Sequence, residues 1–341
     1  MEIARAAVAN HRAFFRRAAA RVERIGGLEL AVREPSGTLP FPRSRRGLDE
    51  AVRRIRRLRL REVGCWSRDE DPALGTLLVA RGFQWGWQPH WLGLELARLP
   101  DEEPSWRIEG PAEAYPRELP YRPHRAEPRA FVELTVRVRG AVVGRAVLNP
   151  WRGVGGIYSM GVVPSARRRG IGRALTLAAC LRARELGCTH AVLNATGEGE
   201  PVYRGLGFES GGLGRTWWWF PRPAPTPRRV ALVEAAGFGD LAALVRLRPR
   251  GAEPRELLGH AVCTGRVEVA EWLLDRGPEL AREPVDLERG ATLLHVAVEW
   301  GDARLVRLAL DRGADLSTRD TAHGGTPADW ARFLGREELL P

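Results

Sequence analysis

The spacing of apolar residues predicts several different elements in the first hundred positions of the chain. Apolar residues recur at helical spacing over residues 4–25, 48–60 and 72–80, and each of these segments is predicted to be a helix. Gly26 and Gly27 end the first of them, as glycines commonly do. Alternating leucines at residues 92–96 follow a tryptophan-rich run and predict a strand. This part therefore combines helices with at least one strand.

In the middle of the chain the strand pattern comes first. Two alternating runs, residues 132–138 and 141–148, are separated by Arg139 and Gly140 and predict a β-hairpin. The later elements are predicted in turn as a strand at 157–163, a helix ending near residue 186, a buried strand at 191–193, a short helix before Phe208 and a last strand at 217–220. The order of strands and helices predicts an α/β domain.

Two proline-rich stretches, residues 99–128 and 221–227, interrupt these patterns. Proline cannot continue a helix or a central strand, and such segments tend to be extended. They predict a first domain over 1–100, a linker over 101–128, a second domain over 129–220, a linker over 221–228 and a third domain over 229–341.

The third part repeats. Gly239, Gly265, Gly301 and Gly335 each follow a helical run, with an alanine four residues earlier. Their spacings of 26, 36 and 34 residues are close to the period of stacked helical hairpins. The sequence therefore predicts an all-α repeat region.

The net charge of +11 is carried unevenly, and arginine supplies every basic side chain. Residues 1–100 carry +8, whereas residues 221–341 carry −2. A basic front suits a polyanionic ligand, but no nucleic-acid recognition motif accompanies it. Residues 1–24 are too rich in Arg and Glu for a signal peptide, and no run is long enough for a membrane span, so a cytoplasmic protein is expected.

The four cysteines show no zinc-ligand spacing and are expected to be reduced thiols, and the histidines form no spaced cluster. No metal site is therefore predicted.

The strongest chemical signal lies between the predicted strand and the predicted helix of the middle part. Arg167, Arg168 and Arg169 precede Gly170-Ile171-Gly172-Arg173. Glycine lets backbone N–H groups approach a ligand closely, and a helix N-terminus attracts anions. Arginine runs usually lie in solvent, but here the strand, glycines and helix together predict a phosphate or pyrophosphate site. Three arginines before the glycines, and no full GxGxxG, argue against a Rossmann dinucleotide site.

Two motifs in this part resemble the GNAT superfamily of acyl-CoA-dependent N-acetyltransferases. Val162-x-Pro164-x-x-Arg167-x-x-Gly170-x-Gly172 matches the cofactor signature, and Asn194-x-Thr196 with Tyr203-x-x-x-Gly207-Phe208 matches the segment that follows the fifth strand. The resemblance implies a mixed-sheet α/β fold and acetyl-CoA as the acyl donor.

The resemblance also implies roles for individual residues. The backbone around Val162 and Val163 would pair with the pantetheine arm, and the N–H groups from Arg168 to Arg173 would hold the pyrophosphate. Arg167 and its neighbours would add positive charge, and Asn194 would hydrogen-bond the arm. Tyr203 would be the general acid that protonates the departing thiolate, although a packing role is about equally expected.

The first part is similar to a degenerate GNAT half. Its Arg81-Gly82-Phe83 echoes Leu206-Gly207-Phe208, and both lead into tryptophan-rich segments. It lacks an Arg-x-x-Gly-x-Gly motif, so no cofactor is expected there. Trp85, Trp87 and Trp91, and also Trp217–Trp219, are expected to pack in cores rather than to bind ligands.

The third part resembles ankyrin repeats. Residues 292–297 read Thr-Leu-Leu-His-Val-Ala, close to the Thr-Pro-Leu-His-x-Ala motif, and Gly325-Thr326-Pro327 begins a second version. His295 is therefore expected to bond the repeat's own backbone rather than to catalyse. The resemblance implies a protein partner on the ankyrin face.

The general base is left open, with Glu133, Glu198 and Glu200 as candidates beside a route through water. The sequence favours an acetyl-CoA-dependent N-acetyltransferase acting on a primary amine of a small molecule or a protein. The alternative is a non-catalytic CoA-sensing or scaffold protein that acts through its ankyrin repeats.

Overall fold

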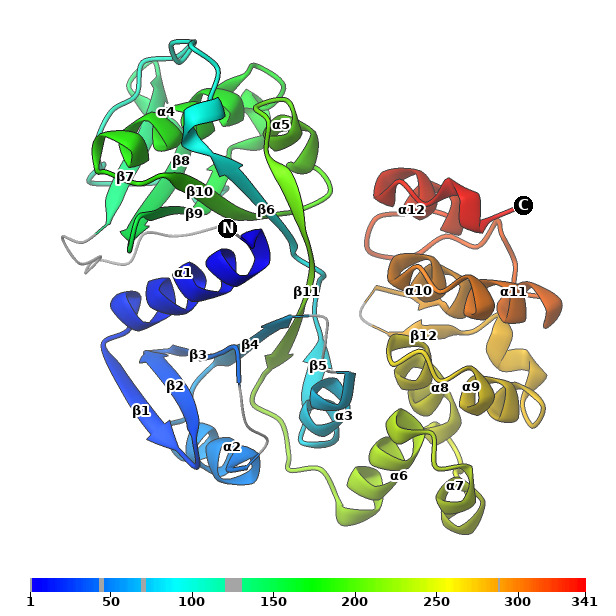
Figure 1. Ribbon diagram of the computed structural model, residues 1–341. Coiled ribbons are helices and arrows are strands. Elements are labelled where there is room, and N and C mark those ends of the chain that lie inside the picture. Colours follow the sequence, from blue (N-terminus) through cyan, green and yellow to red (C-terminus); the bar gives the residue numbers. More distant parts are fainter. Residues whose placement is uncertain (1, 43–45, 69–71, 120–130, 288) are drawn as a thin grey trace. The chain divides into compact units, whose positions relative to one another are not determined.

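The structure is a computed structural model that describes residues 2–42, 46–68, 72–119, 131–287 and 289–341. It contains two compact units (Figure 1). Unit 1 comprises Met1–Asp69 and Gly86–Thr216, and unit 2 comprises Glu70–Trp85 and Trp217–Pro341. A short segment of the N-terminal half thus belongs to unit 2. Residues 120–128 of the predicted linker lie outside the described residues.

The strands of unit 1 form one mixed sheet in the order β1-β2-β3-β4-β11-β6-β10-β9-β8-β7. Two sequence segments contribute the same series of elements: three antiparallel strands, a helix, and a fourth strand parallel to the third. The first series is β1 (Arg21–Ile25), β2 (Leu28–Arg33), β3 (Ser36–Pro40), α2 (Leu48–Arg57) and β4 (Glu62–Arg68). The second is β7 (Val132–Val138), β8 (Ala141–Trp151), β9 (Val154–Val162), α4 (Ile171–Glu185) and β10 (His190–Ala195).

Two strands are exchanged between these series. β6 (His90–Glu95) comes from the first sequence half but pairs with β10 of the second. β11 (Glu209–Trp219) comes from the second half but lies between β4 and β6. The exchange makes the sheet continuous, so neither series ends in a free edge beside its parallel pair.

The first predicted helix, residues 4–25, is correct to Ala18 and wrong at its C-terminal end. α1 covers Ile3–Ala18, and residues 21–25 form β1 instead of continuing the helix to residue 25. Gly26 and Gly27, with φ of 53° and 87°, form the turn of the β1–β2 hairpin rather than a helix end. The strands β1 to β4 were not predicted from periodicity. The helix predicted at 48–60 ends at Arg57, and Arg59 then adopts a φ of 52°.

The predictions for the middle part agree more closely with the structure. Arg139 and Gly140 form the β7–β8 turn with φ of 50° and 83°. The helix predicted to end near residue 186 is α4, and the short helix before Phe208 is α5 (Glu200–Arg204). The last strand is longer than predicted, because β11 begins at Glu209.

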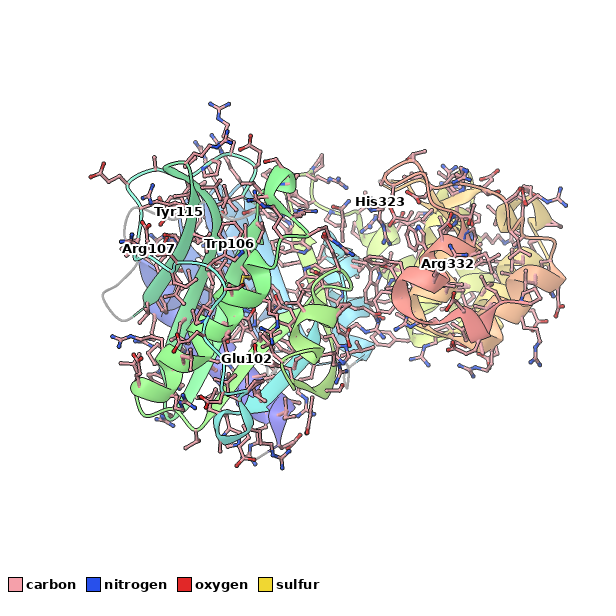
Figure 2. All side chains as sticks on the ribbon, turned by 90° about the horizontal axis from the view of Figure 1, so that it is seen from above. Glu102, Trp106, Arg107, Tyr115, His323 and Arg332 are labelled. Atoms are coloured by element: carbon pink, nitrogen blue, oxygen red, sulfur yellow. The ribbon has the colours of Figure 1, made fainter. Side chains whose placement is uncertain are left out.

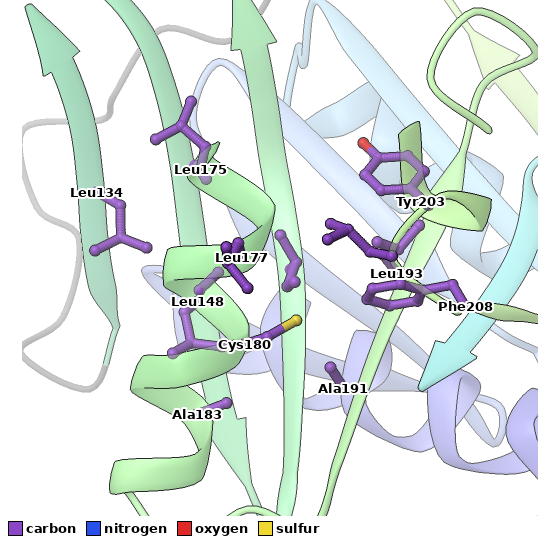
Figure 3. Packing of buried hydrophobic residues seen from close by; sticks show 14 of the residues in the cluster. Leu134, Leu148, Leu175, Leu177, Cys180, Ala183, Ala191, Leu193, Tyr203 and Phe208 are labelled. Carbon is purple, nitrogen blue, oxygen red and sulfur yellow. The ribbon is translucent and has the colours of Figure 1, made fainter. Parts of the chain in front are cut away.

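The core of the second series lies between α4 and the sheet (Figure 3). It is lined by leucines, alanines and Cys180 from α4 and by apolar residues of β6 to β10, and Tyr203 and Phe208 extend it toward α5. Burial raises the pKa of the Cys180 thiol to about 12, so this side chain acts as an inert apolar group. The smaller cluster around α1 includes Phe41, Trp66 and Trp91. Trp91 is therefore a core residue, as predicted.

Unit 2 consists mainly of paired helices that end at the predicted glycines. Gly239, Gly301 and Gly335 close their helices with φ of 80°, 71° and 64°, a conformation that glycine adopts without strain. The helices are α6 (Pro227–Phe238), α7 (Leu241–Leu247), α8 (Glu253–Cys263), α9 (Val267–Leu274), α10 (Leu293–Trp300), α11 (Ala303–Asp311) and α12 (Pro327–Leu334). Between α9 and α10, β12 (Pro284–Asp286) and β13 (Ala291–Thr292) form a small hairpin.

The N-terminal segment of unit 2 packs on the first of these helices. α3 (Pro72–Ala80) lies against α6, and Arg81 pairs with Glu234 at 3.1 Å. β5 (Phe83–Trp85) pairs with the end of β11, and the Trp85 indole N–H donates to Nδ1 of His260 at 3.2 Å. The buried Trp217 and Trp219 confirm the predicted packing role of that tryptophan run.

Candidate functional site

The arginine–glycine turn joins β9 to α4. One turn of 3₁₀ helix, Pro164–Ala166, follows the strand, and Arg168 and Gly170 then adopt φ of 60° and 79°. Gly170 is the N-cap of α4, and no side chain caps the helix. A Cβ at Gly172 would meet nothing within 4 Å, and one at Gly170 would meet only Ser105 Oγ at 3.8 Å. The helix N-terminus is therefore open to a ligand, with its N–H groups available.

Two arginines at the turn are paired with carboxylates that another anion can replace. Arg167 pairs with Glu198 at 3.1 Å and Arg173 with Glu102 at 2.7 Å, and all four side chains are at least 39% exposed. Pairs this exposed contribute little to stability, so a phosphate can replace the carboxylate. Arg168 is exposed, and its backbone has a φ of 60°.

Arg169 is held differently, because its guanidinium lies 5.1 Å from the ring centroid of Trp106. The Trp106 indole N–H donates to the Arg169 carbonyl oxygen at 2.9 Å. Trp106 and Glu102 belong to the loop that precedes β7 (Figure 2). The contact of Arg169 with the Trp106 ring and the hydrogen bond to the Arg169 carbonyl oxygen together fix the backbone of the turn beside the helix N-terminus.

The two parallel strands beneath the turn separate at one end. β9 and β10 pair from Val154 to Ile157 on one strand and from His190 to Leu193 on the other, although both strands continue further. The register of β9 against β8 shifts here, and Ser159 has a φ of 49°, as at a β-bulge. The backbone from Ser159 to Val162 therefore faces a gap in the β10 ladder.

Val162, Val163 and Ile171 surround this gap in different ways. Val162 ends β9 and is partly exposed. Val163 is buried, and its N–H donates to the Val143 carbonyl at 2.9 Å, so it anchors the turn to β8. Ile171, the first residue of α4, is also buried. Val162 is thus the residue of the three whose backbone lies nearest the open strand end.

Asn194 and Tyr203 lie on the next elements along the chain. Asn194 pairs with Trp91 of β6 and lies in the end of β10 that no longer pairs with β9. Tyr203 is 8% exposed on α5, and its ring packs against Phe208. A Cβ at Gly199 would meet Tyr203 Cε2 at 3.1 Å and its hydroxyl at 3.5 Å, so glycine makes room for the phenol there. The phenol of Tyr203 therefore lies beside the β10–α5 loop.

The three candidate bases have different surroundings. Glu133 is bound by Arg145 at 2.9 Å, and their side chains are 10% and 1% exposed, so it serves as the counter-ion of a buried arginine. Glu198 pairs with Arg167 in solvent. Glu200 is partly buried and lies 2.8 Å from Nδ1 of His90. No pattern in the sequence links His90 to Glu200, because 110 residues separate the two.

The corresponding turn of the first series is closed. Gly47 is the N-cap of α2 with a φ of 83°, like Gly170 on α4. Here a Cβ would lie only 2.6 Å from the Gly26 Cα, so the β1–β2 turn covers the helix start. Asp49 and Glu50 in the first turn of α2 add negative charge. This helix start is therefore a poor anion site, and the open one is that of α4.

His295 has the structural role expected for it. Its Nδ1 accepts the Thr292 backbone N–H at 3.2 Å, and its Nε2 lies 3.1 Å from the Gly325 carbonyl oxygen. Burial lowers the pKa of His295, which favours the neutral ring that these two bonds require. His295 therefore joins α10 to the following repeat.

No group of His, Cys, Asp or Glu in the described ranges could hold a metal ion. Within the same ranges, no helix has both the length and the apolar character needed to cross a bilayer.

Comparison with known proteins identifies both regions. Residues 94–208 match the Acetyltransferase (GNAT) family, and residues 232–338 match a model of three ankyrin repeats. Residues 94–208 are therefore similar to the GNAT acetyltransferases. An ankyrin-repeat region follows them.

The curated relatives match parts of the chain. Protein PhlB of Serratia liquefaciens is 36% identical over 117 residues, which are 33% of this chain and 50% of PhlB. Mycothiol acetyltransferase of Saccharomonospora viridis is 44% identical over 62 residues, which are 17% of this chain and 20% of that protein. The chain thus spans half or less of these relatives' lengths.

A solved structure, the GCN5-related N-acetyltransferase from Kribbella flavida, aligns with 64% of this chain and 96% of its own. The sequence identity is 22% and the TM-score is 0.47.

Proposed function

We propose that the protein is an acetyl-CoA-dependent N-acetyltransferase that acetylates a primary amine of a small molecule or a protein. The observation that carries the proposal is the uncapped start of α4 beside the separated ends of β9 and β10. The N–H groups from Arg168 to Arg173 would hold the pyrophosphate. Arg167 would supply charge to the phosphates once it leaves Glu198.

The separated strands suit the rest of the acyl donor. The backbone of β9 at Val162 would pair with the pantetheine amides as an added strand does, once Arg167 Nε leaves the Val162 carbonyl oxygen, 3.3 Å away. Asn194 would hydrogen-bond the arm from β10. The acceptor amine would attack the thioester carbon as the C–S bond breaks. Tyr203 would then donate its proton to the departing thiolate.

We further propose that the ankyrin region binds a protein partner, either the acetyl acceptor or a scaffold. Repeat stacks present extended surfaces of this kind.

The cofactor site can be tested with two matched glycines. Gly170→Asp places a carboxylate at the start of α4, and Gly140→Asp places one in the β7–β8 turn. Both glycines have positive φ, near 80°, and open surroundings, so the two variants share the same backbone strain. In calorimetry we expect G170D to lose acetyl-CoA binding and G140D to keep it. Equal binding by both variants would remove the pyrophosphate site from α4.

Turnover separates the enzyme from the sensor or scaffold. Wild-type protein with acetyl-CoA and primary amines should release free CoA thiol, detected with a chromogenic disulfide. Binding of acetyl-CoA without thiol release on any amine would favour the non-catalytic alternative.

A further inference from the structure

His90 brings a residue of the first sequence half to the end of β10. It begins β6 and pairs with Ala195, the last residue of β10 and the neighbour of Asn194. Its Nδ1 lies 2.8 Å from Glu200 Oε2, and its Nε2 lies 2.7 Å from Ser210 Oγ. A chain of three hydrogen-bonding side chains therefore runs from α5 through β6 to β11.

Glu200 determines how the imidazole is oriented. Burial alone would raise the pKa of Glu200, but the hydrogen bond and charge from His90, together with Arg204, lower it. The ionised carboxylate accepts a hydrogen bond from Nδ1 through Oε2 and from Arg204 through Oε1. Nδ1 thus carries a hydrogen, and in the neutral ring Nε2 presents its lone pair toward the Ser210 hydroxyl.

The outward side of this imidazole is accessible. The His90 side chain is 20% exposed, and Ser210 is an exposed residue beside the register shift between Ser210 and Leu213 on β11. An incoming amine can therefore replace the serine hydroxyl at Nε2. An imidazole oriented by a carboxylate with its second nitrogen open is the arrangement that a general base requires.

The position agrees with that of the proposed acid. Glu200 and Tyr203 are three residues apart on α5, a spacing that places two side chains on the same helix face. Asn194 and Ala195 form the end of β10 that no longer pairs with β9. The proposed acid, the arm-binding amide and the His90–Glu200 pair are therefore on adjoining elements at one end of the sheet.

We propose that His90 is the general base of the acetyl transfer and that Glu200 positions it; this inference rests on the proposed function. Nε2 of His90 takes one proton from the acceptor ammonium, and the neutral amine forms the C–N bond as the C–S bond breaks. The nitrogen then loses its second proton, which restores the phenol of Tyr203 after Tyr203 has given its own proton to the thiolate. His90 then releases its proton to solvent, so the reaction yields amide, CoA thiol and one proton.

Thiol release from acetyl-CoA with spermidine, glucosamine or a lysine-containing peptide tests this role. We expect His90→Gln to lower kcat/KM by about 10²- to 10⁴-fold, the usual contribution of a general base, and to leave acetyl-CoA affinity unchanged. His190→Gln is the matched control, because His190 pairs with Glu95 at the opposite end of the same two strands. It should retain wild-type turnover.

Two further variants separate catalysis from folding. His90→Gly should regain activity when imidazole is added, which a purely structural histidine would not do. Glu200→Gln should lower kcat more than it changes KM, because an amide can donate to Nδ1 and so favour the tautomer whose Nε2 has no lone pair.

The outcomes divide cleanly. If the wild type turns over and H90Q is equally active, the role of His90 is overturned and the proposed function stands. The same conclusion follows if the wild type turns over and imidazole does not restore the activity of H90G. No wild-type turnover on any amine would overturn both.

Discussion

His11 on α1 is predicted to make unit 1 sensitive to acid. Its ring is 3% exposed and stacks on Phe15 and Tyr158, with centroids 4.4 and 4.7 Å away, and meets the edge of Trp66 at 4.6 Å. Nδ1 has no hydrogen-bond partner among the described residues. Burial lowers the pKa of His11 from 6.5 to about 3, because a charged ring would lose its water in this aromatic cluster.

The sign and size of the effect follow from proton linkage. Below pH 6.5 the unfolded chain takes up a proton at His11 that the folded chain does not, so stability is complete above pH 6.5 and falls as the pH drops toward 3. At 1.36 kcal/mol per pH unit, the loss is about 2 kcal/mol at pH 5 and about 5 kcal/mol near pH 3.

Urea unfolding of the wild type and of His11→Phe at pH 7 and pH 5 measures this loss. The phenyl ring keeps the aromatic packing and cannot take a proton, so the wild type should lose about 2 kcal/mol more than H11F between the two pH values. His260, whose pKa burial also lowers to about 3, is present in both proteins and cancels in the comparison. Equal losses in the two proteins would show that His11 becomes charged without unfolding and would refute the reasoning.

Three other changes have defined outcomes. Glu102→Gln should tighten acetyl-CoA binding by about 1.5- to 5-fold in calorimetry, because it releases Arg173 from an exposed and weakly stabilising ion pair; weaker binding would contradict this. Tyr203→Phe should lower kcat by about 10²-fold under conditions where chemistry limits the rate, and an unchanged kcat would rule out the acid role. His295→Leu should destabilise unit 2 by about 2–4 kcal/mol in urea unfolding, because it leaves the Thr292 N–H and the Gly325 carbonyl without their partner. The exposed His323→Gln is its control and should be neutral.

Local patterns in the sequence predicted the elements whose causes are local. Residues 72–80 were predicted as a helix and form one, and the Gly170 turn and the glycines of the repeats lie where their positive φ is needed. Residues 21–25 were assigned to the wrong element, because a short run with two apolar side chains fits a helix end as well as a strand. Residues 21–25 form a strand because they pair with β2 across the glycine turn.

The features that periodicity could not supply depend on contacts between distant segments. Nothing near residue 90 shows that β6 pairs with β10 rather than with the strands of its own half. Glu200 was among the three candidate bases, but its partner His90 becomes visible only through that pairing. Glu133 was named for its carboxylate, and the buried Arg145 that neutralises it lies on the neighbouring strand. The roles of the cofactor residues themselves stay predictions.

The division of the chain into two units makes the ankyrin region more than a C-terminal addition. The backbone passes from one unit to the other three times, after residues 69, 85 and 216. Cutting the chain at the second proline-rich stretch would remove α6 from beneath α3 and leave the Trp85 indole without His260. Residues 72–85 therefore belong structurally with the repeats, and exchanging the repeats for another set would require redesigning this segment as well.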